Sequence, residues 1–421
     1  MEKYIYKCFD CGKVYSKDEI EKELIYLCPL CGTIEKNKPL RGILLIEYDY
    51  QAIRKNHRKE ELMALKPGKF WQYEYLWPLE SHDKTILQID ESQLDLISLS
   101  ADCFQKLSYH GKEFHILDDT RNPTLSFKDR ASSLVALKAL QLGIKEIAAA
   151  STGNAGSSLA GICARLGLKS KVFVPRQIPE AKRIQIQSYG SELVLVDCDY
   201  DLAFDICLEL SSAKRWYNRN TAYNPLTIEG KKWGAYDIFI SAKGNIPGII
   251  FVPTGDGVIL TGLYKGFHEL LELGWIDTLP RLIAVQASGG NAFVRYRQNG
   301  QFEYAPAVSI ADSICAGAPR ALYPANEALK RTSGDTAEVS DDEIYEAQKY
   351  VARNYGILIE PSSSAAFAAF TKFTETEKIT NLSALVLFTG NGLKDIRALK
   401  NWNHDISPLR PDELKKKYGL E

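Results

Sequence analysis

Lys128 lies in the run Asn122-Pro-Thr-Leu-Ser-Phe-Lys-Asp-Arg130, where its amine could act as a nucleophile. Such an amine must be held at one point and desolvated enough to lose its proton. Asn-Pro-Thr predicts an extended entry, because the residue before proline avoids helical geometry. Ser126 is expected to cap a helix that starts near Phe127, and the dipole of that helix would lower the pKa of Lys128. Spacing alone favours an ordinary surface lysine, so other segments must decide.

Three further segments place glycines and hydroxyl groups directly after predicted buried strands. They are Ser151-Thr-Gly-Asn-Ala-Gly156, Pro253-Thr-Gly-Asp-Gly-Val-Ile-Leu260 and Phe388-Thr-Gly-Asn-Gly-Leu-Lys-Asp395. The first joins a strand to a helix, where open α/β sheets bind ligands, and its free N–H groups suit a carboxylate. The second suits a phosphate held by backbone amides; it is no P-loop, because Gly-Lys-Ser/Thr is missing. Taken alone, the first segment is equally compatible with a plain turn.

Four of the nine cysteines form two Cys-x2-Cys pairs, Cys8 with Cys11 and Cys28 with Cys31, separated by the 16 residues 12–27. This spacing is typical of a zinc ribbon. Four thiolates close the metal to water and substrate, which predicts a structural role for the zinc. The alternative, two redox pairs or chance, is disfavoured because neither pair opens a thioredoxin-like βαβ unit. The other cysteines show no pattern, as expected for reduced thiols in the cytoplasm.

Composition and charge exclude several classes of protein. A chain of 421 residues predicts two or three domains, and 45% hydrophobic with 25% charged residues is ordinary for a globular protein. The net charge of -1 gives no drive toward nucleic acid or an anionic membrane. The first residues lack the apolar core of a signal peptide, and no apolar stretch is long enough to span a bilayer. We therefore expect neither a membrane nor a nucleic-acid partner.

The elements that must position the motifs are predicted from short apolar runs that alternate with helical patterns. Strands at 146–150, 171–174 and 192–196 alternate with helices at 157–166, 180–188 and 200–210. A second set comprises strands at 248–252, 281–286, 356–359 and 384–388, a helix at 261–273 and a helix at 341–354 that Ser340 can cap. Three βα units in a row predict a parallel sheet covered on both faces. We expect two α/β halves with a cleft between them.

Two segments near the N-terminus leave alternatives open. Arg54–Glu61 is a dense mixed-charge run, which predicts the solvated face of a connecting helix. The aromatic stretch Pro67–Pro78 is either a stacking surface or, as we favour, a segment packed onto the main body. With the ribbon, these segments would also fit a zinc-ribbon nucleic-acid-binding protein with a retired enzyme domain. The nearly neutral charge argues against that remote alternative.

The run Ser126-Phe-Lys-Asp-Arg130 closely resembles the cofactor-lysine motif of threonine synthases, members of the fold type II (β-family) pyridoxal-phosphate-dependent enzymes. The other three segments match the same family in the same order, from about Ile43 onward. The resemblance implies a tryptophan synthase β-like fold: two parallel-sheet α/β domains with the active site in the cleft between them, beside the small N-terminal four-cysteine zinc ribbon. We expect the ribbon at 1–40, a large domain at 41–121 and 236–421, and a small domain at 122–235.

The resemblance also implies a role for each motif. Lys128 would hold pyridoxal 5'-phosphate and move protons at the substrate's Cα and Cβ. The family's asparagine contacts the cofactor's phenolic oxygen, which falls to Asn154, and Ser151, Thr152 and Asn154 would hold the substrate carboxylate. The cofactor phosphate would be bound by Gly255, Asp256, Gly257, Val258 and Ile259. Thr389 would bond the pyridine nitrogen, which leaves the ring a milder electron sink than a carboxylate would.

The activity implied is that of a threonine synthase, a pyridoxal-phosphate-dependent carbon-oxygen lyase that converts O-phospho-L-homoserine and water to L-threonine and phosphate. Such enzymes are often homodimers. The leaving phosphate needs a basic clamp, for which Arg130, Arg183, Lys265 and Arg320 are available. Arg130 is equally compatible with a structural salt bridge.

Three positions depart from the family pattern. Members often carry threonine at Ala155 and asparagine at Asp256, and many have histidine at Asn391. These departures keep rival activities of the same fold open. The rivals are threonine/serine ammonia-lyase, diaminopropionate ammonia-lyase and cysteate synthase, which differ from threonine synthase mainly in the substrate pocket.

Overall fold

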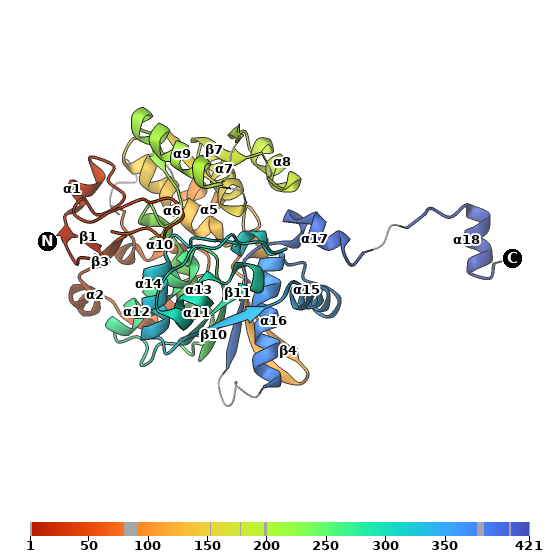
Figure 1. Ribbon diagram of the computed structural model, residues 1–421. Coiled ribbons are helices and arrows are strands. Elements are labelled where there is room, and N and C mark those ends of the chain that lie inside the picture. Colours follow the sequence, from red (N-terminus) through yellow and green to blue (C-terminus); the bar gives the residue numbers. More distant parts are fainter. Residues whose placement is uncertain are drawn as a thin grey trace.

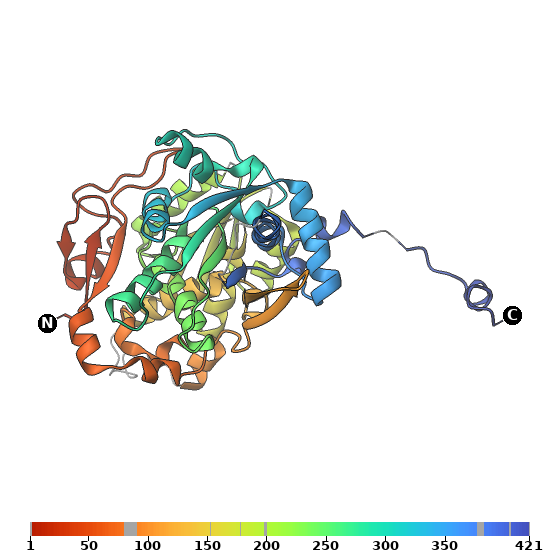
Figure 2. The ribbon, with the colours of Figure 1, turned by 90° about the horizontal axis from the view of Figure 1, so that it is seen from below.

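The computed structural model describes residues 2–79, 91–151, 153–176, 178–197, 200–376, 383–403 and 406–420. These residues form three sheets: a small N-terminal sheet, a four-stranded sheet and a six-stranded sheet (Figures 1 and 2). The predicted α/β class with parallel sheets is confirmed. Among the described helices, none has the length and apolar character that crossing a bilayer requires.

The four-stranded sheet has the order β8-β7-β6-β9, and all of its strands are parallel. Its strands are β6 (Glu146–Ala150), β7 (Lys169–Pro175), β8 (Glu192–Val196) and β9 (Tyr217–Asn218). Its helices are α6 (Lys128–Gln141), α7 (Asn154–Arg165), α8 (Glu180–Ser188) and α9 (Tyr200–Lys214). Helix α9 packs on one face of the sheet, and α7 and α8 pack on the other. The three predicted βα units are therefore confirmed.

The six-stranded sheet has the order β12-β11-β10-β13-β5-β4, parallel except for the edge strand β4. Its strands are β4 (Phe104–Tyr109), β5 (Lys112–Asp118), β10 (Ile249–Pro253), β11 (Arg281–Ala287), β12 (Asp335–Val339) and β13 (Ala384–Phe388). Strands β10 and β13 are buried along their whole length, as their unbroken apolar runs predict for central parallel strands. Helix α16 (Pro361–Glu375) covers one face of the sheet, and α12 (Val258–Glu272) covers the other.

The remaining elements of this half surround the sheet or connect its strands. The helices are α5 (Glu91–Leu96), α10 (Leu226–Lys231), α11 (Trp233–Ser241), α13 (Ala292–Asn299), α14 (Leu322–Arg331), α15 (Asp341–Tyr355), α17 (Ile396–Lys400) and α18 (Pro411–Lys417). Short 3-10 turns are η3 (Asp119–Arg121), η4 (Ser288–Gly290), η5 (Asp312–Ile314) and η6 (Gly392–Lys394). Ser340 caps α15 in a full capping box, as predicted. The C-terminal segment with α18 extends away from the body (Figure 1).

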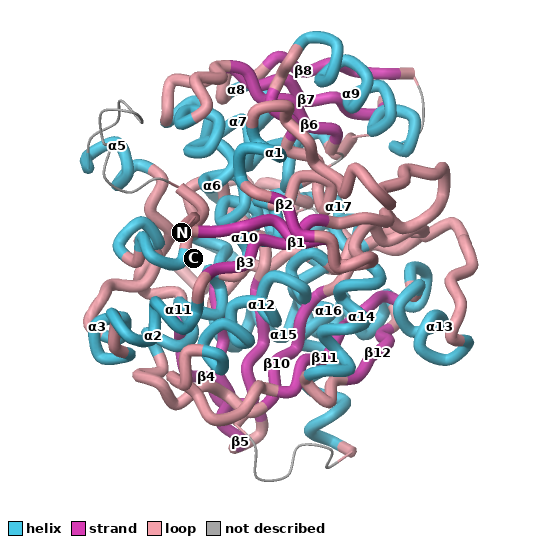
Figure 3. Tube along the Cα trace, turned by 90° about the vertical axis from the view of Figure 1, so that its left-hand side faces the viewer, coloured by secondary structure: helices cyan, strands magenta, loops and turns pink. Residues whose placement is uncertain are grey.

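The N-terminal sheet has the order β2-β1-β3, with β1 (Tyr4–Cys8), β2 (Val14–Tyr15) and β3 (Leu44–Tyr48), next to helix α1 (Lys17–Glu21). Strand β3 follows the second cysteine pair and pairs antiparallel with β1. Figure 3 looks onto this sheet, which lies against α10 between the two larger sheets. The Tyr48 hydroxyl donates to Glu229 of α10 at 2.5 Å, which anchors the sheet to the body.

Two expectations for the connecting segments need correction. The charged run forms two short helices, α2 (Tyr50–Asn56) and α3 (Lys59–Met63), because the chain is extended at the two residues between them. The predicted strand at 356–359 is wrong, since only an isolated bridge between Ile359 and Asn391 forms there. Residue Gly356 instead ends α15 with a left-handed φ of 68°.

The aromatic stretch packs onto the main body, as favoured from the sequence. It forms two 3-10 turns, η1 (Phe70–Gln72) and η2 (Glu74–Leu76). The Phe70 ring lies 3.7 Å from that of Trp233, and the Tyr73 ring lies 5.3 Å from that of Tyr236, centroid to centroid. Both partners belong to α11, so these aromatics are core residues.

Candidate active site

A cavity of about 530 Å³ lies between the two larger sheets. Its wall is contributed by the start of α6, by the loops after β6 and β10, and by the end of β13. The four motifs that are separate in the sequence therefore meet at one place. The cavity lies where the parallel strands end, which is the usual ligand site of open α/β sheets. Lys36 and Asn37, from the loop between the second cysteine pair and β3, also line its wall.

Lys128 is the first residue of α6, and its side chain is half-buried in the cavity wall. The predicted cap by Ser126 is wrong, because the residue before the helix is Phe127 and no side chain caps it. Phe127 instead donates its N–H to the Thr389 carbonyl oxygen at 2.9 Å. The Asp129 carboxylate accepts the Thr124 N–H at 2.7 Å. These two bonds fix the turn that presents the lysine.

Burial lowers the pKa of Lys128 to about 8, and the nearby cations of Arg219 and Lys182 act in the same direction. Asp256 and Glu360 oppose this shift, since a carboxylate favours the ammonium form. The lowered pKa expected from the sequence is therefore present, with desolvation as its largest cause. A substantial fraction of the amine is unprotonated near pH 8, as a nucleophile requires.

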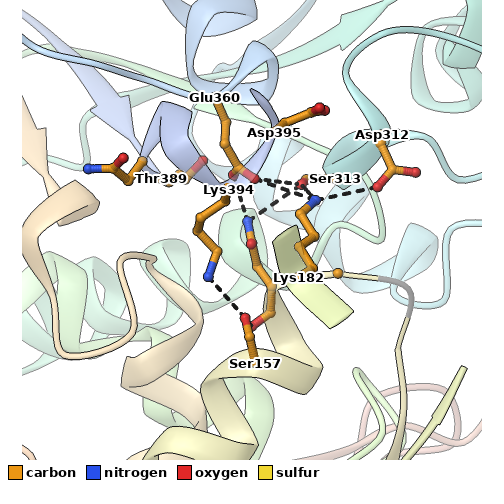
Figure 4. A network of polar contacts seen from close by, with 12 residues as sticks. Ser157, Lys182, Asp312, Ser313, Glu360, Thr389, Lys394 and Asp395 are labelled. Atoms are coloured by element: carbon orange, nitrogen blue, oxygen red, sulfur yellow. Dashed lines mark hydrogen bonds and ion pairs between the residues drawn. The ribbon is translucent and has the colours of Figure 1, made fainter. Parts of the chain in front are cut away.

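Asn154 opens α7 and points across the cavity to the other half of the molecule. Its Nδ2 donates to a carboxylate oxygen of Glu360 at 2.6 Å. Glu360 is buried and forms an ion pair with Lys182 at 3.5 Å, and Lys182 forms another with Asp312 at 3.5 Å (Figure 4). The amide of Asn154 is therefore oriented by a charged network that spans both halves.

Lys394 joins the same region from η6 (Figure 4). Its ammonium donates to Ser157 at 3.0 Å, to Gln185 at 2.6 Å and to the Thr124 carbonyl at 2.8 Å. Burial lowers the pKa of Lys394 to about 8. Ser157 and Gln185 belong to α7 and α8. This lysine therefore connects the turn after β13 of the six-stranded sheet to helices that cover the four-stranded sheet.

Ser151 shapes the loop after β6. Its hydroxyl oxygen accepts the N–H groups of Gly153 at 3.1 Å and Gly156 at 2.9 Å, and the residue lines the cavity. The hydroxyl keeps its own proton to donate. Thr152, the other predicted carboxylate ligand, lies outside the described residues.

The loop from Gly255 to Ile259 lines the cavity and leads into α12. At Gly257, φ is 82°, and a Cβ there would lie 2.8 Å from the Ala325 Cβ. A Cβ at Gly255 would lie 2.9 Å from the Ile314 Cα. Neighbouring protein atoms exclude side chains at both positions, so the loop needs glycine there. The free N–H groups at the start of the helix that follows suit an anion.

Asp256, the acidic residue in this loop, is held by backbone N–H groups of another segment. Its carboxylate accepts the Arg320 N–H at 3.2 Å, and its carbonyl accepts the Ala321 N–H at 2.8 Å. Both donors lie just before α14. The side chain is thus bonded away from the amides at the start of α12.

Thr389 follows β13 and lines the cavity with Ser362. The Thr389 N–H donates to the Ser363 hydroxyl at 2.8 Å. Asn391 is not among the lining residues, because its side chain bonds the Leu393 N–H and the Thr120 carbonyl. Asn391 therefore stabilises a turn and does not face the cavity.

Of the four basic residues considered as phosphate clamps, Arg320 lines the cavity. Arg130 is fully buried and bonds Asp119 at 2.7 and 2.9 Å and Asp237 at 2.5 Å. Of the two interpretations of Arg130, the structural salt bridge is therefore observed. Lys265 is paired with Glu229 and Glu269 on the far side of α10, and Arg183 is not a lining residue.

A family model described as "Pyridoxal-phosphate dependent enzyme" matches residues 103–390, more than half of the chain. A threonine synthase of Methanocaldococcus jannaschii is 34% identical over 395 residues, 92% of each chain. The chain belongs to the threonine synthase family of pyridoxal-phosphate-dependent enzymes. The threonine synthase of Methanosarcina acetivorans is 31% identical over 401 residues, 93% of this chain and 92% of its own. That of Mycobacterium bovis is 31% identical over 306 residues, 72% of this chain and 83% of its own.

Solved structures share the fold of this threonine synthase family member at lower identity. Maize serine racemase superposes with a TM-score of 0.60 at 16% identity, over 75% of this chain and 92% of its own. An O-ureido-L-serine synthase superposes with a TM-score of 0.61 at 17% identity, over 78% of this chain and 99% of its own. These likenesses establish the fold type II architecture that the resemblance predicted.

The residues of the cavity fit the cofactor of the pyridoxal-phosphate-dependent enzymes. The Asn154 Oδ1 and the Ser362 Oγ are buried and have no hydrogen-bond partner among the described residues. A bound ring with polar substituents would give both atoms partners. The loop from Gly255 to Ile259 lines the cavity and leads into the start of α12, where free N–H groups suit a phosphate.

The four predicted metal ligands also meet. The thiols of Cys8, Cys11, Cys28 and Cys31 lie within 4.8 Å of one another. Each turn ends in a glycine that donates its N–H to the first cysteine's carbonyl, Gly12 at 3.0 Å and Gly32 at 2.8 Å. A set of four thiols at this separation fits a tetrahedral zinc ion.

Sequence reasoning missed four charged residues around the cavity: Lys182, Lys231, Glu360 and Lys394. Lys394 lies within the motif Phe388–Asp395, but the motif does not indicate a role for it. The others lie in segments with ordinary helical patterns. Lys182 and Lys231 have charged neighbours in the sequence, and Glu360 is a single charge in an apolar segment. Neither pattern distinguishes an active site from a salt bridge.

Proposed function

We propose that this protein is a threonine synthase that converts O-phospho-L-homoserine and water to L-threonine and phosphate. The supporting observation is that Lys128, with its lowered pKa, lies in the same cavity as the glycine loop at the start of α12. Pyridoxal 5'-phosphate would supply a carbonyl for covalent attachment of the amino acid and an electron sink for carbanion chemistry. The protein would then need to hold the phosphate of the cofactor and the phosphate of the substrate, and to move protons.

We assign roles as follows. Lys128 is the catalytic residue that bonds the cofactor and carries protons between the substrate's Cα and Cβ. Asn154 contacts the cofactor's phenolic oxygen, and Thr389 meets its ring nitrogen. Gly255 to Ile259, Asp256 included, hold its phosphate through the backbone. Ser151, Thr152 and Asn154 bind the substrate carboxylate.

We further propose a structural zinc ion on Cys8, Cys11, Cys28 and Cys31, because the thiols converge and no lining residue of the cavity belongs to that cluster. The domain division at 1–40, 41–121 with 236–421, and 122–235 remains our proposal, as does a cytoplasmic location. We also propose a homodimer. In the C-terminal segment, Ile406 is 91% exposed and Leu420 is 76% exposed, which provides apolar surface for a second copy.

The deciding experiment is the visible spectrum of the purified full-length protein, before and after adding O-phospho-L-homoserine. We expect a yellow protein whose band shifts with that substrate while phosphate and threonine appear in equal amounts. Lys128→Ala should lack the band. A yellow protein that ignores O-phospho-L-homoserine and acts on serine or phosphoserine would instead be one of the rival lyases. A protein that stays colourless with added pyridoxal phosphate would overturn the enzyme assignment.

A further inference from the structure

Lys231, the last residue of α10, differs from the other buried lysines. It is 1% exposed and lines the cavity. The others each meet oxygen acceptors: Lys138 with Glu21, Lys182 with Glu360 and Asp312, Lys232 with Glu229 and Glu269, and Lys394 with Ser157 and Gln185. In the part of the chain that the structure describes, Lys231 forms no hydrogen bond or ion pair. A buried ammonium without a partner is unfavourable, so a ligand is the natural partner.

Two glycine contacts fix the position of this lysine. A Cβ at Gly230 would lie 2.5 Å from the Arg130 carbonyl oxygen, so α10 packs directly on the first turn of α6. A Cβ at Gly262 would lie 2.6 Å from the Lys231 Cβ, so the stem of the lysine also packs on α12. Lys231 is therefore wedged between the helix that begins with Lys128 and the helix that begins at the glycine loop.

The charges around Lys231 favour an anion. Burial lowers the pKa of Lys231 well below its ordinary value, and the cations of Lys128 and Arg219 act in the same direction. Asp256 opposes the shift, but its carboxylate is bonded to the Arg320 N–H. A dianion that enters between these cations would restore the ammonium form of Lys231 and gain a charge-assisted hydrogen bond.

We propose that Lys231 is a phosphate-binding residue of the cavity, whose ammonium bonds a phosphate monoester placed at the start of α12. Two compounds carry this group: pyridoxal 5'-phosphate and, if the proposed function holds, the substrate. The contact between Lys231 and α12 favours the cofactor phosphate, because the glycine loop precedes the same helix. The amides of that loop and the ammonium would then share one dianion.

The test compares Lys231→Met with Lys330→Met, which removes the same charge from an exposed position of α14. Dissociation constants are measured on the cofactor-free full-length chain for pyridoxal 5'-phosphate and for pyridoxal, which lacks the phosphate. We expect Lys231→Met to bind pyridoxal 5'-phosphate about tenfold to a hundredfold more weakly and to bind pyridoxal unchanged. Lys330→Met should match the wild type in both titrations.

The second arm uses the holoenzyme with inorganic phosphate as the probe. If Lys231 binds the substrate's phosphate, cofactor affinity stays unchanged while the dissociation constant of inorganic phosphate rises about tenfold. A Lys231→Met variant with wild-type circular dichroism, wild-type melting temperature and unchanged affinities in both arms would overturn the proposal. In the second arm, phosphate binding to the holoenzyme is followed by isothermal titration calorimetry, so the constant obtained is a dissociation constant. Neither arm requires threonine formation, so both stand even if the proposed reaction does not occur.

A measurement on the wild-type chain covers the case in which Lys231→Met does not fold. Lysines of the cofactor-free protein are acetylated with acetic anhydride, with and without inorganic phosphate, and each site is quantified by mass spectrometry. We expect phosphate to protect Lys231 severalfold and to leave Lys330 unaffected. Equal acetylation of Lys231 under both conditions would refute phosphate binding at this position.

Discussion

Lys128 shows how a single side chain gains reactivity from its surroundings. Its pKa of about 8 compares with 10.5 for an ordinary lysine, and burial is the largest cause of the difference. Because the pKa is depressed, the ammonium form dominates below about pH 8 and the reactive amine dominates above it. The motif predicted a lowered pKa for this lysine, but it attributed the shift to the helix end, whereas desolvation is the largest cause.

This environment makes a prediction about pH. The rate at which the cofactor-free chain captures pyridoxal 5'-phosphate should rise with pH and level off above about pH 8, since only the amine attacks. Stopped-flow absorbance measures the rate, and Nα-acetyl-lysine in the same buffers is the reference. A protein rate that keeps climbing toward pH 10, parallel to the reference, would show that Lys128 is an ordinary lysine.

Arg130 illustrates what the sequence conceals at the same scale. Its partner Asp237 is 107 positions away in the chain, so no local pattern could distinguish a salt bridge from a phosphate clamp. Likewise, Lys231 and Lys232 are neighbours in the sequence, yet one lines the cavity and the other pairs with Glu229. Such assignments depend on the packing of distant elements.

Replacing this arginine should affect folding first. Arg130→Met leaves Asp119 and Asp237 buried without their cation, and we expect the free energy of unfolding to fall by about 3–5 kcal/mol. Urea denaturation followed by circular dichroism measures the loss. The double variant Arg130→Met/Asp237→Asn should recover part of it, because one uncompensated charge is removed. Wild-type stability in Arg130→Met would contradict the buried ion pair.

At the scale of elements, six strands of the two larger sheets were predicted from the sequence (β6, β7, β8, β10, β11 and β13), whereas β4, β5, β9 and β12 were not. Strands β10 and β13 are unbroken apolar runs, and β6 is apolar after Glu146, which the sequence displays directly. Strand β12 carries a mixed pattern, Asp-Thr-Ala-Glu-Val, because it is an edge strand that is only partly buried. The strands of the N-terminal sheet are short and are separated by the cysteine turns, so the sequence shows no clear strand pattern there.

Helix α10 controls the alignment of the site through its glycine. In Gly230→Ala the new methyl would meet the Arg130 carbonyl oxygen at 2.5 Å and force α10 away from α6. We expect a loss of about 1–3 kcal/mol in stability together with weaker cofactor binding, measured by denaturation and by spectral titration. Gly290→Ala is the control, since its nearest contact would be an ordinary 3.4 Å. Equal behaviour of the two variants would argue against close packing of α10.

At the scale of the whole molecule, specific contacts hold the N-terminal sheet and its four cysteines, here called the cysteine module, against the two larger sheets and their helices, here called the catalytic body. Tyr48 bonds Glu229, and the Leu40 N–H donates to the Arg320 carbonyl at 3.1 Å. The spacing of the four cysteines in the sequence was enough to predict that they cluster. It could not predict these contacts, because they join residues far apart in the chain.

The proposed zinc should therefore stabilise more than its own module. We expect one zinc per chain by elemental analysis, and its near-complete loss in Cys28→Ser with a lower melting temperature. Cys163→Ala, which removes a buried thiol outside the cluster, should keep the metal. Wild-type protein that contains no zinc after purification in zinc-supplemented buffer, yet melts at the same temperature as Cys28→Ser, would refute a structural metal.

Lys36 and Asn37 place the cysteine module in the wall of the catalytic cavity. The cavity would therefore lose part of its wall if the module were removed. A chimera that grafts this catalytic body onto the N-terminal segment of another family member would inherit a foreign stretch of wall, and with it a foreign substrate preference.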